Sequence, residues 1–376
     1  MTVRRTKTVL DQSTTAPDSR GQLIFSAIIS EHLITGEPVG SKMIAEKFAN
    51  ASGMSSATIR NVMGELEEMG LLEQPHTSAG RIPTDEGYRF YVDNLLGVLS
   101  LPENDLKLIS KELGLSDLEI PDSPERLMER TSHVLSALSR NVGIVVSPSL
   151  ASDKLQHIQF VNLSDQRVLV VLVSAPSIVH NKIIRLNETI PQDDLDKTAR
   201  YLNAEFGGKS LSEIRSEILR LMHDDKALFD KLLQNAMILC SQSIEDESAM
   251  SGEVYVEGTS NIINQSDFAD LDRLRELLRT IEEKTRLLQI LNECMTDKPE
   301  AGGVKVVIGK ENASSTLQDC TLITAPYSLG DGASFGTLTV LGPTRIEYGR
   351  MISIVGYVAR LLEKVLSTQH GDRRYH

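Results

Sequence analysis

The spacing of apolar residues predicts a helical module at the start of the chain. From residue 19 to residue 35 they recur with helical periodicity, and one face collects Ile24, Ala27, Ile28 and Ile34. The turn at 35–40 contains Gly and Pro, which end this helix. Ser41 stands at the N-cap of a short second helix that buries Ile44 and Phe48.

A third helix is predicted from a cap at Ser55 or Ser56 to about Gly70. Its apolar face is centred on Ile59 and is completed by Val62, Met63, Leu66 and Met69. The opposite face carries small and polar side chains, which are Ala57, Arg60, Asn61, Gly64 and Glu68. Glu65 and Glu67 lie toward the far end of this helix.

A hairpin and a departing helix complete the predicted module. Leu71 and Leu72 begin one strand, the small residues of "HTSAG" suit the tip, and Ile82 anchors the return strand. Thr84 then caps a helix that leaves the module over "DEGYRFYVDNLLGVL".

Further along, the β-rich material falls into two blocks. Strands are predicted at "VGIVVS", "LQHIQFVNL", "RVLVVLVS" and "IVHNKIIRL", and again at "GEVYVEG", "VKVVIG", "TLITAP" and "FGTLTVLG". Between them lie helices at 193–206, 210–222 and 226–245, and one long helix from about Asp267 to Met295 with an apolar stripe that begins at Leu271. Either an α+β domain interrupted by an insertion or two α+β domains in series satisfies this pattern.

Composition excludes several functional classes. The 376 residues suffice for two or three domains, and no stretch reaches the apolar length of a membrane span. The three cysteines, Cys240, Cys294 and Cys320, are too dispersed for a metal site and indicate reduced, buried thiols in a cytoplasmic protein. "GGVKVVIGKEN" departs from a P-loop at Val304 and Glu311, and neither HExxH nor GxSxG occurs. The sequence therefore gives no sign of an enzyme, a metal or a cofactor.

The third helix and the hairpin hold the residues that could read DNA. A recognition helix presents its N-terminal residues to base edges, where Arg pairs with guanine and Asn with adenine, and small neighbours allow close approach. Ser56, Thr58, Arg60 and Asn61 meet this need, and Arg81 could enter a minor groove or bind a phosphate. A plain amphipathic helix with a solvated polar face fits the spacing about equally well.

The sequence resembles the family of bacterial heat-inducible transcription repressors HrcA. The resemblance is carried by "EPVGSKMIAEKF", "SSATIRNVMGELEEMGLLEQPHTSAGRIPTDEGYRFYVD", "VYVEGTSNII", "IGKEN", "DCTLITAPY" and "GPTRIEYGRMISIVGYVARLL". It extends over nearly the whole chain from about Ser19. Val62 stands where the family often has an acidic residue, and the segment before Ser19 is longer than usual.

The resemblance implies an α+β fold with a winged helix, a GAF-like domain and a mostly helical dimerisation domain, with a small antiparallel sheet, inserted into the GAF-like domain. The expected parts are a flexible tail at 1–18, the winged-helix DNA-binding domain at 19–98, and the GAF-like domain at 99–187 and 267–370. The inserted dimerisation domain is expected at 188–266.

The resemblance also implies a function. A homodimer would bind an inverted-repeat operator of the type called CIRCE in this family and repress heat-shock chaperone operons, with the chaperonin GroEL as partner. DNA contacts would fall on Ser56, Thr58, Arg60 and Asn61 of the helix and on His76 and Arg81 of the wing. The family has no agreed ligand, so no cofactor is expected; a regulator whose GAF-like domain binds a metabolite is the alternative.

The net charge of −13 qualifies the DNA-binding interpretation. Residues 1–90 contain nine Lys or Arg and eleven Asp or Glu, a net −2, so −11 lies in the remainder of the chain. Because each subunit can neutralise few phosphates, we expect weak non-specific binding, a shallow salt dependence and reliance on two half-sites at once.

Overall fold

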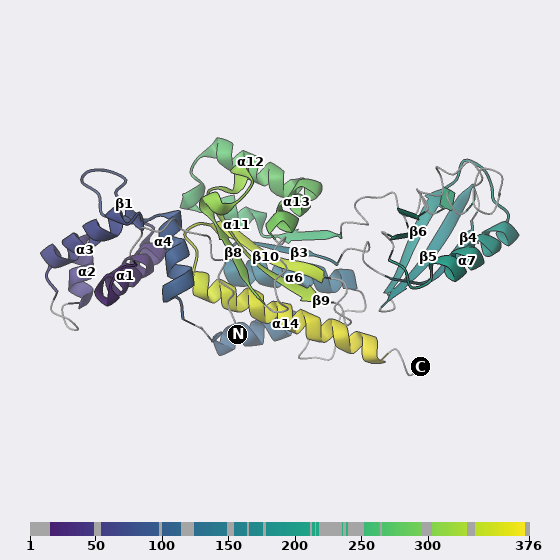
Figure 1. The fold of residues 1–376 in the computed structure, drawn as a ribbon, viewed down its shortest axis with the longest axis horizontal. Coiled ribbons are helices and arrows are strands. Elements are labelled where there is room, and N and C mark those ends of the chain that lie inside the picture. The colour runs from purple at the N-terminus through teal and green to yellow at the C-terminus, as the bar shows by residue number, and fades with distance from the viewer. Residues whose placement is uncertain are drawn as a thin grey trace. The chain divides into compact units, whose positions relative to one another are not determined.

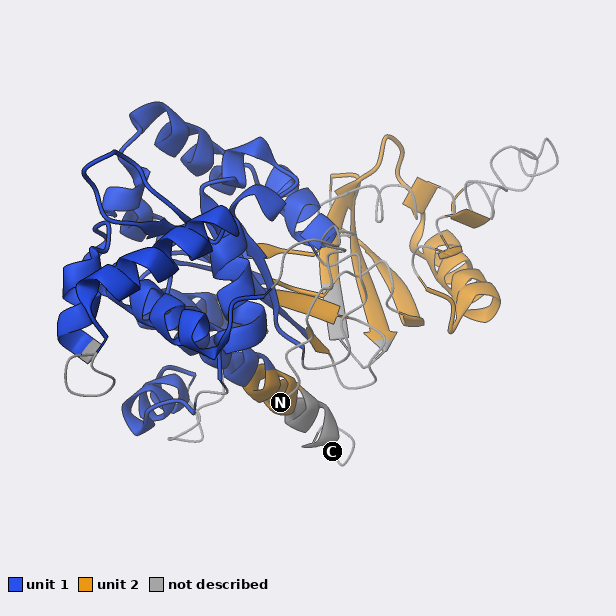
Figure 2. Ribbon diagram, turned by 60° about the vertical axis from the view of Figure 1, so that its left-hand side comes forward, with its two compact units in different colours: residues 1–145, 255–326, 338–359 blue, residues 146–254, 327–337, 360–376 orange. Residues whose placement is uncertain are grey.

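A computed structural model of the chain describes residues 16–48, 54–97, 100–113, 124–148, 154–163, 165–175, 178–210, 252–263, 265–294, 303–328 and 335–372, with a few isolated positions between 213 and 239. It is a mixed α/β structure with small antiparallel sheets (Figure 1). Two compact units divide it: one of residues 1–145, 255–326 and 338–359, and one of residues 146–254, 327–337 and 360–376 (Figure 2).

The N-terminal module consists of α1 (Ser19–Thr35), α2 (Ser41–Phe48), α3 (Ser56–Glu68), β1 (Leu72–Glu73), β2 (Ile82–Pro83) and α4 (Asp85–Phe90). Asp18 caps α1 by accepting from the Gly21 amide at 2.7 Å, and Gly36 ends the helix with a left-handed φ of 73°. The core between α1 and its neighbours contains Ile24, Phe25, Ile28, Ile29, Ile44 and Ile59, which are all fully buried. The predicted start and end of α1 are confirmed.

Ile34 was predicted on the buried face of α1, and this is wrong, because it is 76% exposed. Six helical positions separate it from Ile28, which rotates its side chain by roughly 120° away from that residue. Phe25, Ile29 and His32 take the buried positions instead. The described residues leave the Phe48 side chain out, so its predicted burial stays a prediction.

α4 does not continue as one long α-helix. It passes at Tyr91 into a π-helical turn, η1 (Tyr91–Leu95), and a separate helix, α5 (Glu103–Glu112), follows. The predicted cap is confirmed, since the Thr84 hydroxyl accepts from the Gly87 amide at 3.0 Å.

A five-stranded sheet, here the central sheet, has the order β7-β3-β10-β9-β8. Its strands are β3 (Val142–Val146), β7 (Val254–Glu257), β8 (Lys305–Ile308), β9 (Cys320–Ser328) and β10 (Phe335–Pro343). The neighbouring helices are α6 (Pro124–Ser139), α11 (Thr259–Ile263), α12 (Leu271–Glu282), α13 (Lys284–Cys294) and α14 (Tyr348–Asp372), with the 3₁₀ turns η4 (Ser266–Phe268), η5 (Gly309–Glu311) and η6 (Ser315–Leu317). Because β3 lies between strands that follow it by more than a hundred residues, the central sheet is interrupted in sequence, as the insertion alternative requires.

The single long helix predicted from about Asp267 to Met295 is wrong, because the structure has two shorter helices there. It is broken at Glu283, whose ψ of 83° is not helical, and α12 and α13 result. Leu271, the first residue of the predicted stripe, is 65% exposed. Each shorter helix buries a face of its own, with Leu274, Leu277 and Ile281 on α12 and Leu287, Leu288, Ile290 and Leu291 on α13.

The second compact unit contains the antiparallel sheet β4-β5-β6, made of β4 (Lys154–Asn162), β5 (Arg167–Ala175) and β6 (Ile178–Arg185), with α7 (Gln192–Phe206). α7 buries its apolar face in the core of this unit, which includes Phe160, Leu202 and Phe206. Asn203 of α7 also pairs with the backbone of Ile158, at 2.8 and 2.9 Å. These strands therefore group with α7, whereas the sequence-based boundary at 187/188 separates them from it.

The helices predicted at 210–222 and 226–245 lie almost wholly outside the described residues, as do residues 1–15 of the predicted tail. None of the helices described is long and apolar enough to cross a membrane.

Candidate nucleic-acid interface

α3 presents a polar face because its apolar face is fully used in packing. Ile59, Met63 and Leu66 are buried against α1 and α2, and Val62 is buried at the margin with 9% exposure. Arg60 and Asn61 are exposed on the opposite side, together with Ala57 and Glu68. The predicted faces of this helix are confirmed at these positions, whereas Met69, predicted inward, is half-buried just after the helix ends, and Gly64, predicted outward, is half-buried. The residues that would touch DNA stay a prediction.

Hydroxyl groups fix the N-terminal end of α3. Ser55 is the N-cap, and its Oγ accepts from the Thr58 amide at 3.2 Å and lies 2.9 Å from Thr58 Oγ1. Ser56 Oγ lies 3.0 Å from Ser41 Oγ at the start of α2. Two of the predicted contact residues, Ser56 and Thr58, therefore already have hydroxyl partners and are partly buried. Ser56 thereby joins the start of α3 to the start of α2, and Thr58 completes the cap of α3.

The hairpin is held at its tip and at its base. Gln74 Nε2 donates to the carbonyls of Thr77 and Ala79 at 3.1 and 2.9 Å, which closes the loop that carries the exposed His76. At the base, Val39 and Arg81 exchange two backbone hydrogen bonds of 2.9 Å. Gly80 permits this approach, since a Cβ there would stand 2.4 Å from the Val39 carbonyl.

Arg81 differs from the sequence-based expectation. Its side chain is 21% exposed and its Nε donates to Glu67 Oε2 of α3 at 2.8 Å. The guanidinium therefore bridges the hairpin to α3, where the sequence pattern suggested a group directed at DNA. Glu67 is four positions from the buried Met63 and directly follows the buried Leu66, so periodicity alone gave no sign of this pairing.

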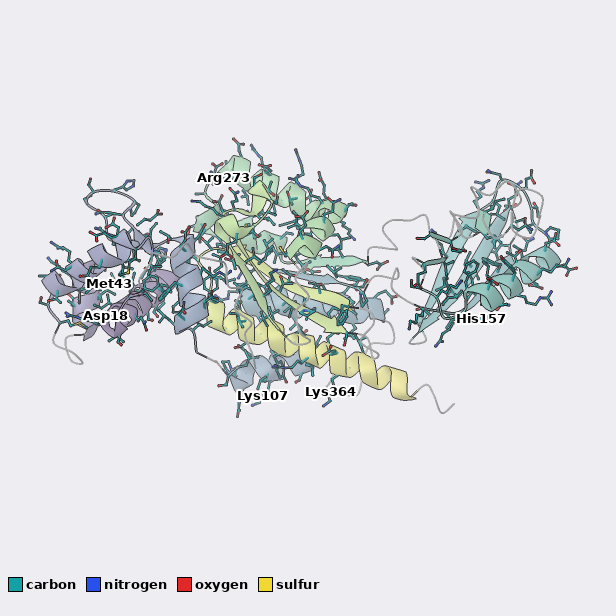
Figure 3. All side chains as sticks on the ribbon, in the orientation of Figure 1. Asp18, Met43, Lys107, His157, Arg273 and Lys364 are labelled. Carbon is teal, nitrogen blue, oxygen red and sulfur yellow. The ribbon has the colours of Figure 1, made fainter. Side chains whose placement is uncertain are left out.

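A groove of about 520 Å³ separates the start of α2 from the hairpin tip and α3. Three cations line it, Lys42, Arg60 and Arg81, and no acidic residue is among the described residues that do so. Lys42 and Arg60 form no ion pair with any residue the structure describes, whereas the neighbouring Lys47 is paired with Glu31. Figure 3 labels Met43, which follows Lys42 in the sequence and marks this part of the module.

The charge pattern of this groove suits a polyanion. Unpaired cations beside backbone amides of a helix start attract phosphate, and the attraction is local even in an acidic protein. Lys42 was not among the residues predicted from the sequence. Its position directly after Ser41, in the first turn of α2, is the signal that could have found it.

A second, polar cleft of about 510 Å³ lies where the N-terminal module meets loops of the central sheet. His32, Tyr88, Asp267 and Arg345 are among its lining residues. Burial lowers the pKa of His32, whose Nδ1 lies 3.0 Å from the Glu37 carbonyl. The Tyr88 hydroxyl is also buried and has no hydrogen-bond partner among the described residues.

The cysteines, the possible metal ligands and the "GKEN" segment form no second site among the described residues. Burial raises the pKa of Cys320 to about 12, so this thiol is unreactive, and Cys294 is half-buried; Cys240 lies outside the described residues. Among the residues described, no cluster of His, Cys, Asp and Glu could hold a metal ion. The "GKEN" segment forms the turn after β8, where Glu311 accepts from the Ile308 amide at 2.8 Å.

A helix with an exposed polar face beside a cationic groove is typical of nucleic-acid-binding proteins. Comparison with known proteins gives the family. The family described as "HrcA protein C terminal domain" matches residues 125–352. The chain is 38% identical over 353 residues to the heat-inducible transcription repressor HrcA of Syntrophobacter fumaroxidans, covering 94% of this chain and 98% of that protein. It is 39% identical over 347 residues to the HrcA of Geobacter sulfurreducens, covering 92% and 97%.

The chain therefore belongs to the family of heat-inducible transcription repressors HrcA. A crystal structure titled as a hypothetical protein shares the fold, with a TM-score of 0.58, 23% identity, and coverage of 94% of this chain and 99% of that one.

Proposed function

We propose that this chain is a homodimeric winged-helix repressor that binds an inverted-repeat, CIRCE-type operator of heat-shock chaperone operons. At normal temperature it would keep those operons silent. α1–α3 would form the helical part of the DNA-reading domain, α3 would be the recognition helix and β1–β2 the wing. Membership in the HrcA family supports the repressor class.

The observation that carries the proposal is the exposed Arg60–Asn61 face of α3 beside a groove that none of the described carboxylates lines. In the proposed complex, Arg60 and Asn61 read base edges and Lys42 and His76 contact the backbone. Arg81 contacts the backbone when its guanidinium exchanges Glu67 for a phosphate. Ser56 and Thr58 contribute at the N-terminal end of the helix, where bases and phosphates are nearest.

We further propose that the central sheet with its helices is the GAF-like domain and that the segment inserted into it carries the dimerisation function. We place this insertion within residues 146–254, the longest segment of the second compact unit, in place of 188–266. A two-fold dimer would present two α3 helices to two half-sites, which compensates for the few cations on each subunit.

Two binding experiments test the function. A duplex with the intact inverted repeat should be retarded at protein concentrations at which a duplex with one scrambled half-site is not. Equal retardation of both duplexes would refute sequence-specific dimer binding. Footprinting on chaperone promoters should then protect both half-sites, and added GroEL should increase the protected fraction if the chaperonin helps the repressor reach its active form.

The alternative, a metabolite-responsive regulator, requires an apolar pocket with converging polar groups in the GAF-like domain. The 510 Å³ cleft instead lies beside the N-terminal module and is lined by charged residues such as Asp267, Lys310 and Arg345. We therefore favour the repressor without a small ligand.

A further inference from the structure

Arg89 of α4 attaches the N-terminal module to the edge of the central sheet. Its Nε donates to Glu311 Oε1 at 2.7 Å, and its Nη2 donates to the other oxygen of that carboxylate and to the Val306 carbonyl, at 2.6 Å for the latter. Val306 lies in β8 and Glu311 in the turn after it. The side chains of Arg89 and Glu311 are only 18% and 35% exposed. A bidentate, half-buried pair of this kind fixes direction as well as distance.

Arg345 makes a second attachment, at the end of α1. It lies between β10 and α14, and its Nε and Nη2 donate to the two oxygens of Asp267 at 2.9 and 2.7 Å. Its Nη1 donates to the Leu33 carbonyl in the last turn of α1 at 3.2 Å, where the helix dipole favours a cation. Gly36 leaves room for the guanidinium, since a Cβ there would stand 3.2 Å from Arg345 Cζ.

Two further contacts join the module to the central sheet and its helices. Asp85 at the start of α4 accepts from the Lys310 amide at 3.0 Å, and the rings of Tyr88 and Tyr348 contact each other at a tilt of 41° with centroids 5.4 Å apart. The junction, meaning Asp85, Tyr88, Arg89, Glu311 and Arg345 with their partners, thus holds the module at the end of α1 and along α4. Neither arginine lines the cationic groove beside α3.

A single flexible attachment would let the module turn on α4, whereas two attachments at separate points resist rotation. We infer that Arg89 and Arg345 are positioning residues that fix the direction in which α3 faces and thereby set the spacing of operator half-sites that the protein accepts. This inference rests on the proposed function, because half-site spacing matters only when a dimer binds an inverted repeat.

The test compares the full chain with the double variant Arg89→Met/Arg345→Met on three kinds of duplex. These are the CIRCE-type repeat, the same repeat with its spacer lengthened or shortened by a few base pairs, and a single half-site. The unaltered protein should lose about tenfold or more in affinity when the spacer changes, because the second half-site no longer adds its effective concentration. The double variant should bind all spacers within about threefold of one another, and the single half-site as the unaltered protein does.

The matched control is Arg275→Met. Arg275 on α12 also loses an ion pair, with Asp272 at 3.0 Å, but it lines neither the cleft at the junction nor the cationic groove. The control should keep the original spacer preference. A double variant with an unchanged spacer preference would overturn the inference.

Hydrogen exchange gives a readout that does not depend on DNA. The Lys310 amide, which donates across the junction to Asp85, should exchange faster in the double variant, while the amides of α3 stay protected. If the unaltered protein ignores the inverted repeat, the proposed function fails. If instead the Lys310 amide keeps its protection in the double variant, the two arginines do not hold the junction and the inference fails.

Discussion

Arginine is used in opposite ways on the α3–hairpin surface and at the junction with the central sheet. Arg60 on α3 is exposed and makes no ion pair with a described residue, whereas Arg89 on α4 is 18% exposed and holds both oxygens of Glu311. A guanidinium with free donors can form hydrogen bonds with a binding partner, and these offset its desolvation. One whose donors are already used contributes to the protein's own geometry.

Arg81 stands between these two cases. It lines the same groove as Arg60 but is paired with Glu67 at 2.8 Å. A cation that lines the groove is therefore not always available to bind DNA, because an ion pair within the protein can already hold it. The α3–hairpin surface and the junction share none of these residues, so each can be changed by mutation without altering the other.

The largest effect is expected from Gly309→Ala, which breaks the junction. Gly309 has φ +52°, and a Cβ there would stand 2.2 Å from the Asp85 carboxylate. The left-handed conformation costs about 1–2 kcal/mol for alanine, and displacing Asp85 from the Lys310 amide costs about 0.5–1.5 kcal/mol more. Denaturant unfolding should show this loss, while binding to a single half-site should be unchanged among the folded molecules. A variant with an unchanged free energy of unfolding would mean that these junction contacts do not contribute to stability.

Arg60→Ala tests the α3–hairpin surface. If Arg60 pairs with a base, operator binding should weaken by about 1–3 kcal/mol, or roughly five- to 150-fold, with the free energy of unfolding changed by less than about 0.5 kcal/mol. Fluorescence anisotropy titration measures the first quantity and denaturant unfolding the second. Arg279→Ala, at an exposed arginine on α12, is the matched control and should alter neither. Equal effects of the two variants would remove Arg60 from the contact set.

Glu67→Gln should weaken the pairing of Arg81 within the protein and make it more like the unpaired Arg60. Loss of the carboxylate charge weakens the hold on the guanidinium, so Arg81 becomes available to a phosphate. The slope of log K against log salt should then become steeper by about 1, with tighter non-specific binding at low salt. A slope identical to that of the unaltered protein would show that Arg81 engages phosphate, or fails to, regardless of Glu67.

Much of the α3–hairpin surface could be predicted from the sequence because it depends on local rules. Helical periodicity placed Ile59 and Leu66 inside and Arg60 and Asn61 outside, and the turn residues placed the hairpin. The same rules failed where an element's end or phase mattered, as for Ile34 on α1 and the break at Glu283. A single non-helical residue changes which face is buried, and no periodic signal marks it.

The junction could not be predicted, because its partners are far apart in the chain. Arg89 and Glu311 are separated by 222 positions, and Arg345 and Leu33 by 312. The sequence around an arginine does not indicate which distant carboxylate it pairs with. The grouping of β4–β6 with α7 has the same origin, since it depends on the core that these elements share rather than on any one of them.

The smallest effect, and the one that separates folding from binding most cleanly, is expected for Gly64→Ala on the outer face of α3. A Cβ at Gly64 meets no atom within 4 Å, so alanine should stabilise the helix by about 0.5–1 kcal/mol. If α3 lies close against DNA, the added methyl group should nevertheless weaken operator binding. Gly70→Ala is the matched control: a Cβ there is equally unobstructed, but φ is +74°, so alanine should destabilise by about 1 kcal/mol. A Gly64→Ala protein that is both more stable and equally tight on the operator would show that α3 does not approach DNA along this face.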